Sequence, residues 1–287
     1  MKNTGIKDPI FLQAVEAIDN GDLPALKELV TNHKYLITDR YQSGEKGYFK
    51  DPYLLWFVAD NPIRRQYMPG NIIGITEFLI QSIKEQSFIN YQHQINYALG
   101  LVGTGRIPKE SGQQIELMKL LIDAGAKPGN GHGEIANGNI DAAKYLIERG
   151  GELTLTTALC LDLQKEVEQL LSNATATDKQ IALLTAAFFG DAEKIKLLLK
   201  HGANVNGYLD ASSGFHHHAT ALHQAIYSGS LEAVELLVNA NADLRAKDKI
   251  YGGTPLDWAR YMQTETSDDN QKKKYATIEI YLRSKLS

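Results

Sequence analysis

Apolar residues recur along the chain with the spacing of one buried face of a helix. The clearest case is Leu231, Val234, Leu237 and Val238, which stand at i, i+3, i+6 and i+7. This spacing predicts an amphipathic helix whose stripe faces a core. The same four-position stripe fits seven further segments, so the sequence predicts eight units. Its second position is held by Leu26, Thr76, Met118, Ala143, Val167, Ile195, Val234 and Ile278. Its third position is held by Leu29, Leu79, Leu121, Leu146, Leu170, Leu198, Leu237 and Tyr281. Its fourth position is held by Val30, Ile80, Ile122, Ile147, Leu171, Leu199, Val238 and Leu282.

A second, shorter helical segment precedes each stripe and ends at a small residue. That place is shared by Ala17, Ala158, Ala186, Ala225 and Ala259. A glycine usually follows four residues later, at Gly21, Gly138, Gly190 and Gly229. Glycine there supplies the left-handed residue that ends a helix and reverses the chain. The unit is therefore helix, tight turn, helix and loop, and such pairs bury their stripes only by stacking side by side.

Sequence motifs identify the kind of repeat. Successive third positions run from residue 29 to residue 281 in seven steps, a mean of 36 residues. Ankyrin units are about 33 residues long and tetratricopeptide units about 34, so length alone does not decide. Residues 220–225 read T-A-L-H-Q-A, residues 253–259 read G-T-P-L-D-W-A, and residues 202–206 read G-A-N-V-N. These strings resemble the T-P-L-H-x-A box of ankyrin repeats and the G-A-D segment that follows their second helix.

The resemblance to ankyrin-repeat proteins implies a fold and a role. The fold is an all-α solenoid of about eight helix-turn-helix units with long loop fingers, forming one domain over residues 1–287. Residues 181–260 are most typical, residues 1–180 are divergent repeats, and residues 261–287 are a C-terminal capping unit. Strings around residues 53–64 and 214–225 look like those of bacterial ankyrin proteins. The implied function is non-catalytic protein–protein interaction through the concave face and the fingers.

The box residues have structural roles in this interpretation. A threonine hydroxyl caps the first helix, proline in the first turn costs no hydrogen bond, and the histidine ring ties neighbouring boxes together. We assign this structural motif to Thr220, Leu222, His223, Thr254 and Pro255.

Departures from the repeat length mark exposed loops, which in a solenoid often lie on the binding face. Long connections occur at residues 41–53, 61–70 and 208–219, with a shorter case at 248–252. Because aromatic and arginine side chains often anchor interfaces, they are candidate partner contacts. The candidates are Tyr48, Phe49, Arg64, Arg65, Tyr208, Phe215, His216, His217 and Tyr251. The alternative is that these aromatic residues fold back and pack their own loops against the stack.

Histidines suggest a second possible function. His216, His217 and His218 stand in succession, and clustered imidazoles suit zinc, copper or nickel. A small-molecule or metal-ion sensor built on the finger 208–218 is therefore the alternative function, although three consecutive side chains on a loop rarely converge on one ion. His132 is expected in a box position like that of His223, since each lies six residues before a glycine.

The remaining motifs argue against catalysis and cofactors. Cys160 is expected to be buried in a first helix, without the histidine and asparagine or aspartate framework of a nucleophile. Residues 100–105 and 129–133 are glycine-rich but lack the patterns of a nucleotide-binding loop. We therefore expect no enzyme, no metal site and no cofactor.

Composition narrows the setting. The chain has 30 Lys and Arg against 34 Asp and Glu, a net charge of -4, which argues against a nucleic-acid partner. A single cysteine excludes a disulfide scaffold. No apolar stretch is long enough to span a membrane, and residues 1–20 lack an export signal. We expect a cytoplasmic monomer that binds another protein.

Overall fold

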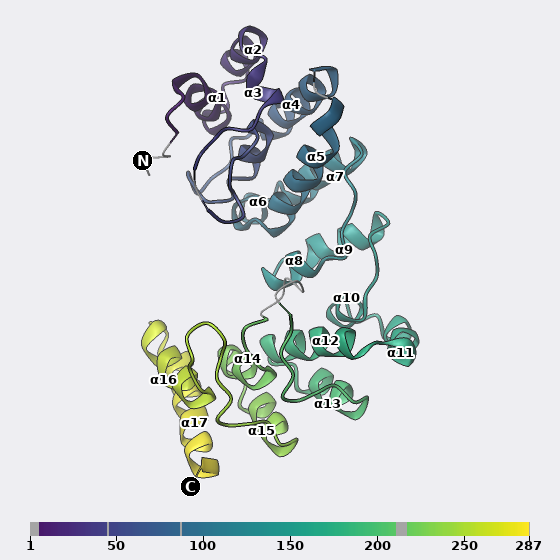
Figure 1. Cartoon of the computed structure of the whole chain (residues 1–287), viewed down its shortest axis with the longest axis vertical. Coiled ribbons are helices and arrows are strands. Elements are labelled where there is room, and N and C mark those ends of the chain that lie inside the picture. The colour runs from purple at the N-terminus through teal and green to yellow at the C-terminus, as the bar shows by residue number, and fades with distance from the viewer. Residues whose placement is uncertain (1–5, 45, 87, 211–216, 287) are drawn as a thin grey trace. The chain divides into compact units, whose positions relative to one another are not determined.

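The computed structural model describes residues 6–44, 46–86, 88–210 and 217–286, and these residues form helices and loops without a β-strand (Figure 1). The expected all-α fold is confirmed. The chain divides into two compact units, Met1–Glu152 (unit 1) and Leu153–Ser287 (unit 2). A single repeat domain over residues 1–287 stays a prediction.

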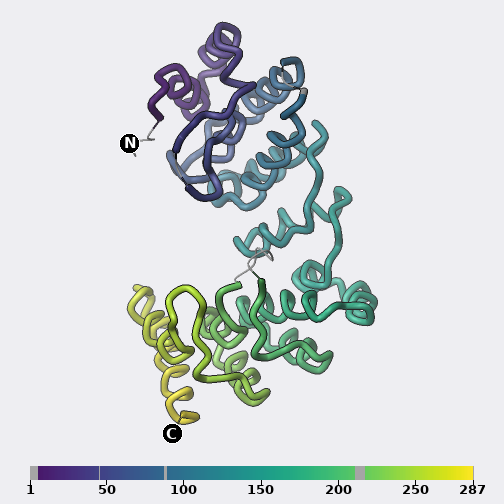
Figure 2. The backbone as a smooth tube through the Cα atoms, viewed as in Figure 1, coloured from purple at the N-terminus to yellow at the C-terminus, as the bar shows by residue number. Residues whose placement is uncertain are grey.

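In unit 1 the first helices of successive pairs lie in one row and the second helices in another. The first row consists of α1 (Pro9–Asn20), the 3₁₀ helix η1 (Leu54–Ala59), α5 (Phe88–Thr104) and α8 (His132–Ala136). The second row consists of α2 (Leu23–Asn32), α4 (Ile72–Gln86), α7 (Gln114–Asp123) and α9 (Ile140–Glu148). Two short helices, α3 (Tyr35–Thr38) and α6 (Arg106–Glu110), lie in the connections. Figure 2 shows the connections on either side of η1 as long loops beside the helices.

Unit 2 repeats the two-row arrangement. Its first row consists of α10 (Leu155–Cys160), α12 (Ala176–Phe188), α14 (Ala221–Ser228) and α16 (Pro255–Glu265). The second helices are α11 (Gln164–Asn173), α13 (Ala192–Lys200), α15 (Leu231–Asn239) and α17 (Asp269–Leu286). Each of them packs on the first helix of its own pair, and α13, α15 and α17 also contact one another in turn. How many of the pairs in the two units are ankyrin repeats stays a prediction.

The turns between paired helices close in the same way again and again. A backbone N–H reaches back five residues to a carbonyl oxygen, across a residue with positive φ. Before second helices these bonds join Asp22 to Ala17, Gln113 to Pro108, Asn139 to Glu134, Leu163 to Ala158 and Asp191 to Ala186, at 2.8–3.2 Å. After second helices they join Ala126 to Leu121, Gly151 to Leu146, Ala203 to Leu198 and Ala242 to Leu237, at 2.9–3.0 Å. This is the 6→1 bond that satisfies a carbonyl at a helix end.

Burial confirms part of the predicted stripe and corrects the rest. The second position is buried in all eight helices, and even Thr76 is fully buried because its hydroxyl donates to the Ile72 carbonyl at 2.8 Å. The third position is buried in α4, α7, α9, α13 and α15. In α2, α11 and α17 the fourth position is buried instead, through Val30, Leu171 and Leu282. These three helices are turned about their axes relative to the template, so one fixed template does not describe every unit.

Candidate binding surface

The box of α14 is held by a buried histidine. The Thr220 hydroxyl lies 2.8 Å from His223 Nδ1, and His223 Nε2 lies 3.1 Å from the Gly253 carbonyl oxygen. Because a carbonyl only accepts, Nε2 carries the proton and Nδ1 accepts from Thr220. Burial lowers the pKa of His223, although the Gly253 hydrogen bond opposes this. A neutral ring therefore joins the start of α14 to the turn that precedes α16.

The turn before α16 is organised by one carboxylate. Asp248 accepts the backbone N–H groups of Ile250, Tyr251 and Gly253 at 2.6–3.0 Å, and also Trp258 Nε1 at 3.1 Å. Burial alone raises the pKa of Asp248, but these hydrogen bonds outweigh it and hold that pKa below its usual range. The turn presents Ile250 and Tyr251 to solvent, with exposed fractions of 57% and 83%. Tyr251 is thus an aromatic side chain on a turn fixed by hydrogen bonds.

A set of aromatic residues missed in the sequence lies at equivalent places in unit 2. Phe188, Tyr227 and Tyr261 each stand two residues after the small alanine of their first helix. The rings of Phe188 and Tyr227 stack with centroids 5.3 Å apart and planes 12° apart. Tyr227 and Tyr261 are exposed, as is the neighbouring Phe189. Aligning the first helices on their alanines would have found these residues, because the signal lies in that register.

Together these side chains define a surface on the first-helix side of unit 2. We call it the unit 2 aromatic surface, and it comprises Phe188, Phe189, Tyr227, Ile250, Tyr251 and Tyr261. A hydrogen bond with Glu265 is the main cause of the raised pKa of Tyr261, and the charge of Tyr251 adds a smaller effect. Tyr251 and Tyr261 therefore lie close to each other. Aromatic side chains that are exposed on fixed backbone are typical anchors of protein interfaces.

The loop 41–53 of unit 1 uses most of its aromatic residues internally. Phe49 is 9% exposed and packs edge-on against Phe57 with centroids 5.2 Å apart. Tyr48 is 58% exposed, and its hydroxyl donates to Asn61 Oδ1 at 2.9 Å. Phe49 therefore packs its own loop, which is the alternative considered from the sequence, while Tyr48 keeps an accessible ring.

The two arginines of the loop 61–70 are also engaged within unit 1. Arg64 pairs with Asp19 at 2.7 Å and donates to the Phe57 carbonyl at 2.7 Å. Arg65 donates to Asn20 Oδ1. Asp60 accepts the backbone N–H groups of Arg64 and Arg65 and fixes the turn. Arg64 thus fastens the loop to α1 and is mostly buried, which leaves little of it for a partner.

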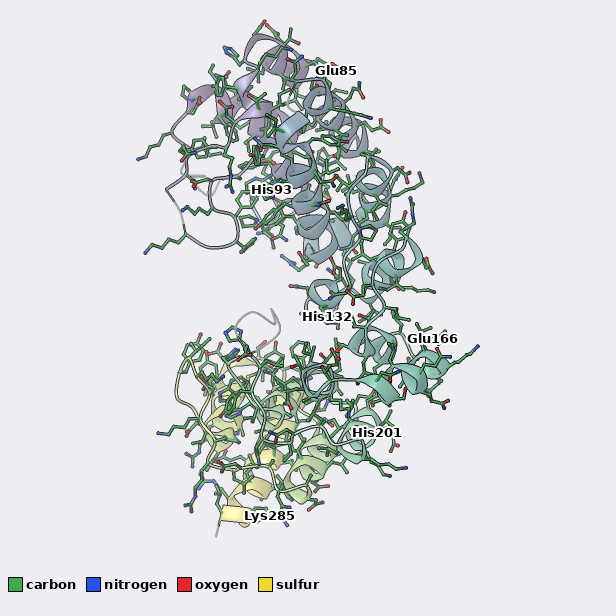
Figure 3. All side chains as sticks on the ribbon, turned by 45° about the vertical axis from the view of Figure 1, so that its right-hand side comes forward. Glu85, His93, His132, Glu166, His201 and Lys285 are labelled. Carbon is green, nitrogen blue, oxygen red and sulfur yellow. The ribbon has the colours of Figure 1, made fainter. Side chains whose placement is uncertain are left out.

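A second aromatic group surrounds Trp56 in unit 1. The Trp56 and Tyr97 rings stack with centroids 4.1 Å apart, and His93 meets the Trp56 ring edge-on at 5.6 Å. The Arg40 guanidinium lies 5.5 Å from the Trp56 ring centre. His93 is labelled in Figure 3. Because Trp56 is 1% exposed, it is a core residue.

The finger after α13 is described only in part. The Tyr208 hydroxyl donates to the Lys247 carbonyl at 2.8 Å, and the Lys249 ammonium lies 4.7 Å from the Tyr208 ring centre. Tyr208 therefore joins its finger to the following one. His217 is half-buried, 6.1 Å from the His218 ring, while Phe215 and His216 lie outside the described residues. In the part of the chain that the structure describes, no three His, Cys, Asp or Glu residues are placed to hold a metal ion.

Two further candidates are placed as follows. Cys160 is partly exposed at the end of α10, and burial of its thiol raises its pKa to about 11, which makes it a poor nucleophile at neutral pH. His132 is the first residue of α8 (Figure 3), whereas His223 is the third residue of α14. The expected box position for His132 is wrong, because Gly131 caps α8 and the helix starts later than in the other pairs.

None of the helices in the described ranges is both long and apolar enough to cross a membrane.

Comparisons with known proteins agree with the repeat geometry. The proteins named ankyrin repeat and SOCS box protein 6 from Pongo abelii and Homo sapiens are each 40% identical over 78 residues, and the Mus musculus protein is 38% identical. The match covers 27% of this chain, and the chain spans less than a fifth of these curated relatives. They are mammalian, so they do not support the expected likeness to bacterial proteins. A family model of ankyrin repeats (3 copies) matches residues 136–248. That segment therefore consists of ankyrin repeats, which generally mediate protein–protein interaction and are generally non-catalytic.

Proposed function

We propose that this chain is a non-catalytic protein-binding module whose partner docks on the unit 2 aromatic surface and the adjoining fingers. The observation that carries the proposal is the exposure of aromatic side chains at equivalent positions of consecutive helix pairs. A monomeric protein gains nothing for its own folding from Tyr251 at 83% exposure or Tyr261 at 60% exposure. A partner that covers them would gain the burial of large, stiff side chains.

The geometry favours this surface over the loop residues first considered in unit 1. Phe49 and Arg64 are committed to internal contacts, so covering them would yield little additional buried area. Tyr251 differs, because Asp248 accepts its backbone N–H and fixes the backbone, while the side chain stays exposed. Little ordering entropy is then lost at this position on binding.

The test is capture of a partner from a lysate of the source organism by the full chain and by two variants. The surface variant carries Tyr227→Ala, Tyr251→Ala and Tyr261→Ala. The control carries Ile280→Ala, which removes an apolar side chain from α17 whose exposed fraction, 69%, lies within the range of the three tyrosines. Circular dichroism and thermal melting first establish that both variants fold.

We expect wild type and control to capture the same protein. The affinity of the surface variant for that protein should be at least tenfold lower, a loss of about 1.4 kcal/mol. Equal retention by all three proteins would overturn the assignment of this surface. Photo-crosslinking from position 227, compared with position 280, then identifies the contact directly.

A further inference from the structure

One helix of unit 1 carries a carboxylic acid at a place where three other first helices carry an alanine. Glu134 on α8 has the place that Ala17, Ala158 and Ala186 hold in their own helices. The same 6→1 bond establishes this equivalence, since the Asn139 N–H donates to the Glu134 carbonyl at 2.8 Å. Glu134 is only 6% exposed. A long acidic side chain thus occupies a position that is normally reserved for a methyl group.

The neighbouring helix makes room for it. Glu134 lies against Gly103, near the end of α5, and a Cβ at Gly103 would overlap the carboxylate and come within 3.2 Å of Glu134 Cδ. The nearby amide donors serve other atoms: Asn139 Nδ2 and Gln114 Nε2 both donate to the Gly103 carbonyl, at 2.9 and 3.0 Å. The carboxyl group is therefore buried against the Gly103 backbone, and the hydrogen bonds described for these two amides go to backbone carbonyls.

No cation of the described residues compensates the buried carboxyl. Among the described residues no ion pair includes Glu134. Lys109 of α6 donates to the Gly138 carbonyl at 2.7 Å. Tyr97, the nearest titratable residue of α5, lies six residues from Gly103, about 9 Å along the helix. Two cations near α8 belong to other carboxylates, since Arg106 is paired with Glu110 and Lys144 with Glu148. The other titratable groups on α8 and on the helices packed against it are Asp141, Tyr145, Tyr91, His93 and His132. Burial raises the pKa of Glu134, and a hydrogen bond from its own N–H offsets only part of this.

We propose that α8 is a proton-controlled latch, seated on α5 when Glu134 is neutral and released when Glu134 ionises. Seating α8 has a consequence for shape, because Asn137, directly after α8, lines a cavity of about 580 Å³. The other wall of that cavity comes from Tyr48, Asn61 and Ile63 of the long loops and Leu101 of α5. Release of α8 would remove one wall of the cavity while the two loops stay fastened by their own contacts.

Linkage fixes the form of the pH dependence. The seated state binds the proton more tightly than the released state, in which Glu134 has an ordinary pKa near 4.5. Opening therefore releases a proton at pH values between the two pKa values, and the opening constant rises by up to about tenfold per pH unit there. Below pH 4.5 and above the raised pKa the opening constant is flat.

Hydrogen exchange of the full chain tests the latch. Mass spectrometry follows peptides covering residues 131–139 from pH 4.5 to 8.5, corrected for the intrinsic exchange rate. Peptides from α2 serve as an internal reference for unfolding of the whole unit. Wild type is compared with two variants of the buried residue. Glu134→Ala restores the usual small residue, and Glu134→Gln keeps the shape of the side chain without a titratable proton. The control is Glu116→Ala, which removes an exposed glutamate of α7.

The expected result is a loss of α8 protection with rising pH in wild type and Glu116→Ala, with α2 unaffected. Both Glu134 variants should show protection that does not depend on pH. A pH-independent α8 in wild type would overturn the latch, as would the same pH dependence in Glu134→Gln. Parallel loss in α2 and α8 would also overturn it, because that result means unfolding of unit 1 as a whole.

Discussion

Two neighbouring leucines in each of two helices provide a sharp test of the helix orientations. In α13, Leu198 is fully buried and Leu199 half-buried. In α11 the order is reversed, with Leu171 at 6% exposure and Leu170 half-buried. We therefore expect Leu198→Ala to destabilise unit 2 more than Leu199→Ala, and Leu171→Ala more than Leu170→Ala.

The expected loss of stability for each substitution follows from how deeply the leucine is buried. Truncating a buried leucine to alanine costs about 2–5 kcal/mol, because transfer and cavity contributions add. A half-buried leucine leaves no closed cavity and loses roughly half the transfer contribution, about 1 kcal/mol. The two substitutions in each helix should therefore differ by about 1–4 kcal/mol in their loss of stability, with opposite order along the chain in α11 and α13.

The chain offers a convenient probe, since it has two tryptophans, Trp56 in unit 1 and Trp258 in unit 2. In a Trp56→Phe background, the fluorescence of Trp258 reports on unit 2 during urea unfolding, and the slope m checks that the transition is comparable between variants. A larger loss for Leu170→Ala than for Leu171→Ala would refute the rotation of α11. If the first leucine of the pair mattered more in both helices, one stripe with a buried third position would describe α11 as well as α13.

Two further predictions concern other positions. Gly151→Ala should destabilise unit 1 by about 1–3 kcal/mol, because a Cβ there would lie 2.9 Å from the Leu146 carbonyl oxygen and against the Gly129 carbonyl oxygen. Thermal melting followed by circular dichroism at 222 nm measures this loss of stability. A loss below about 0.5 kcal/mol, which is typical of surface substitutions, would contradict the contact. Burial lowers the pKa of His223, so the unfolded chain takes up a proton near pH 6.5 before the native ring does, and unit 2 should lose stability as pH falls below that value. Urea unfolding of wild type and His223→Gln at pH 7.5 and pH 5 checks this, and equal pH sensitivity in both proteins would show that another group is responsible.

The sequence predicted the repeated helix pairs well because the same local rules act in each. An apolar second stripe position and a glycine or another residue with positive φ in the turn are local features, so Leu26 and Val234 could be placed without knowing their neighbours. The third and fourth positions depend on how each helix is turned against its own partners. That choice separates Leu171 from Leu198, and periodicity alone does not contain it.

The candidate surface was harder to predict for a related reason. Arg64 is held by Asp19, which lies 45 residues away, and no local pattern links the two. Phe49 and Tyr48 are adjacent, yet one ring enters the core and the other faces solvent. The buried place of Glu134 becomes visible only when α8 is aligned through its turn, because its acidic side chain breaks the small-residue pattern that was sought.

The 6→1 turns also decide where the chain can change length over evolutionary time. Each turn closes over a fixed count of residues, so inserting or deleting one residue breaks its bond and shifts the following stripe by about 100°. We therefore expect changes of length to be tolerated mainly in the fingers and in the loops around η1. For protein engineering, the same restriction directs the insertion of an epitope or a reporter domain to such loops and away from the helix turns.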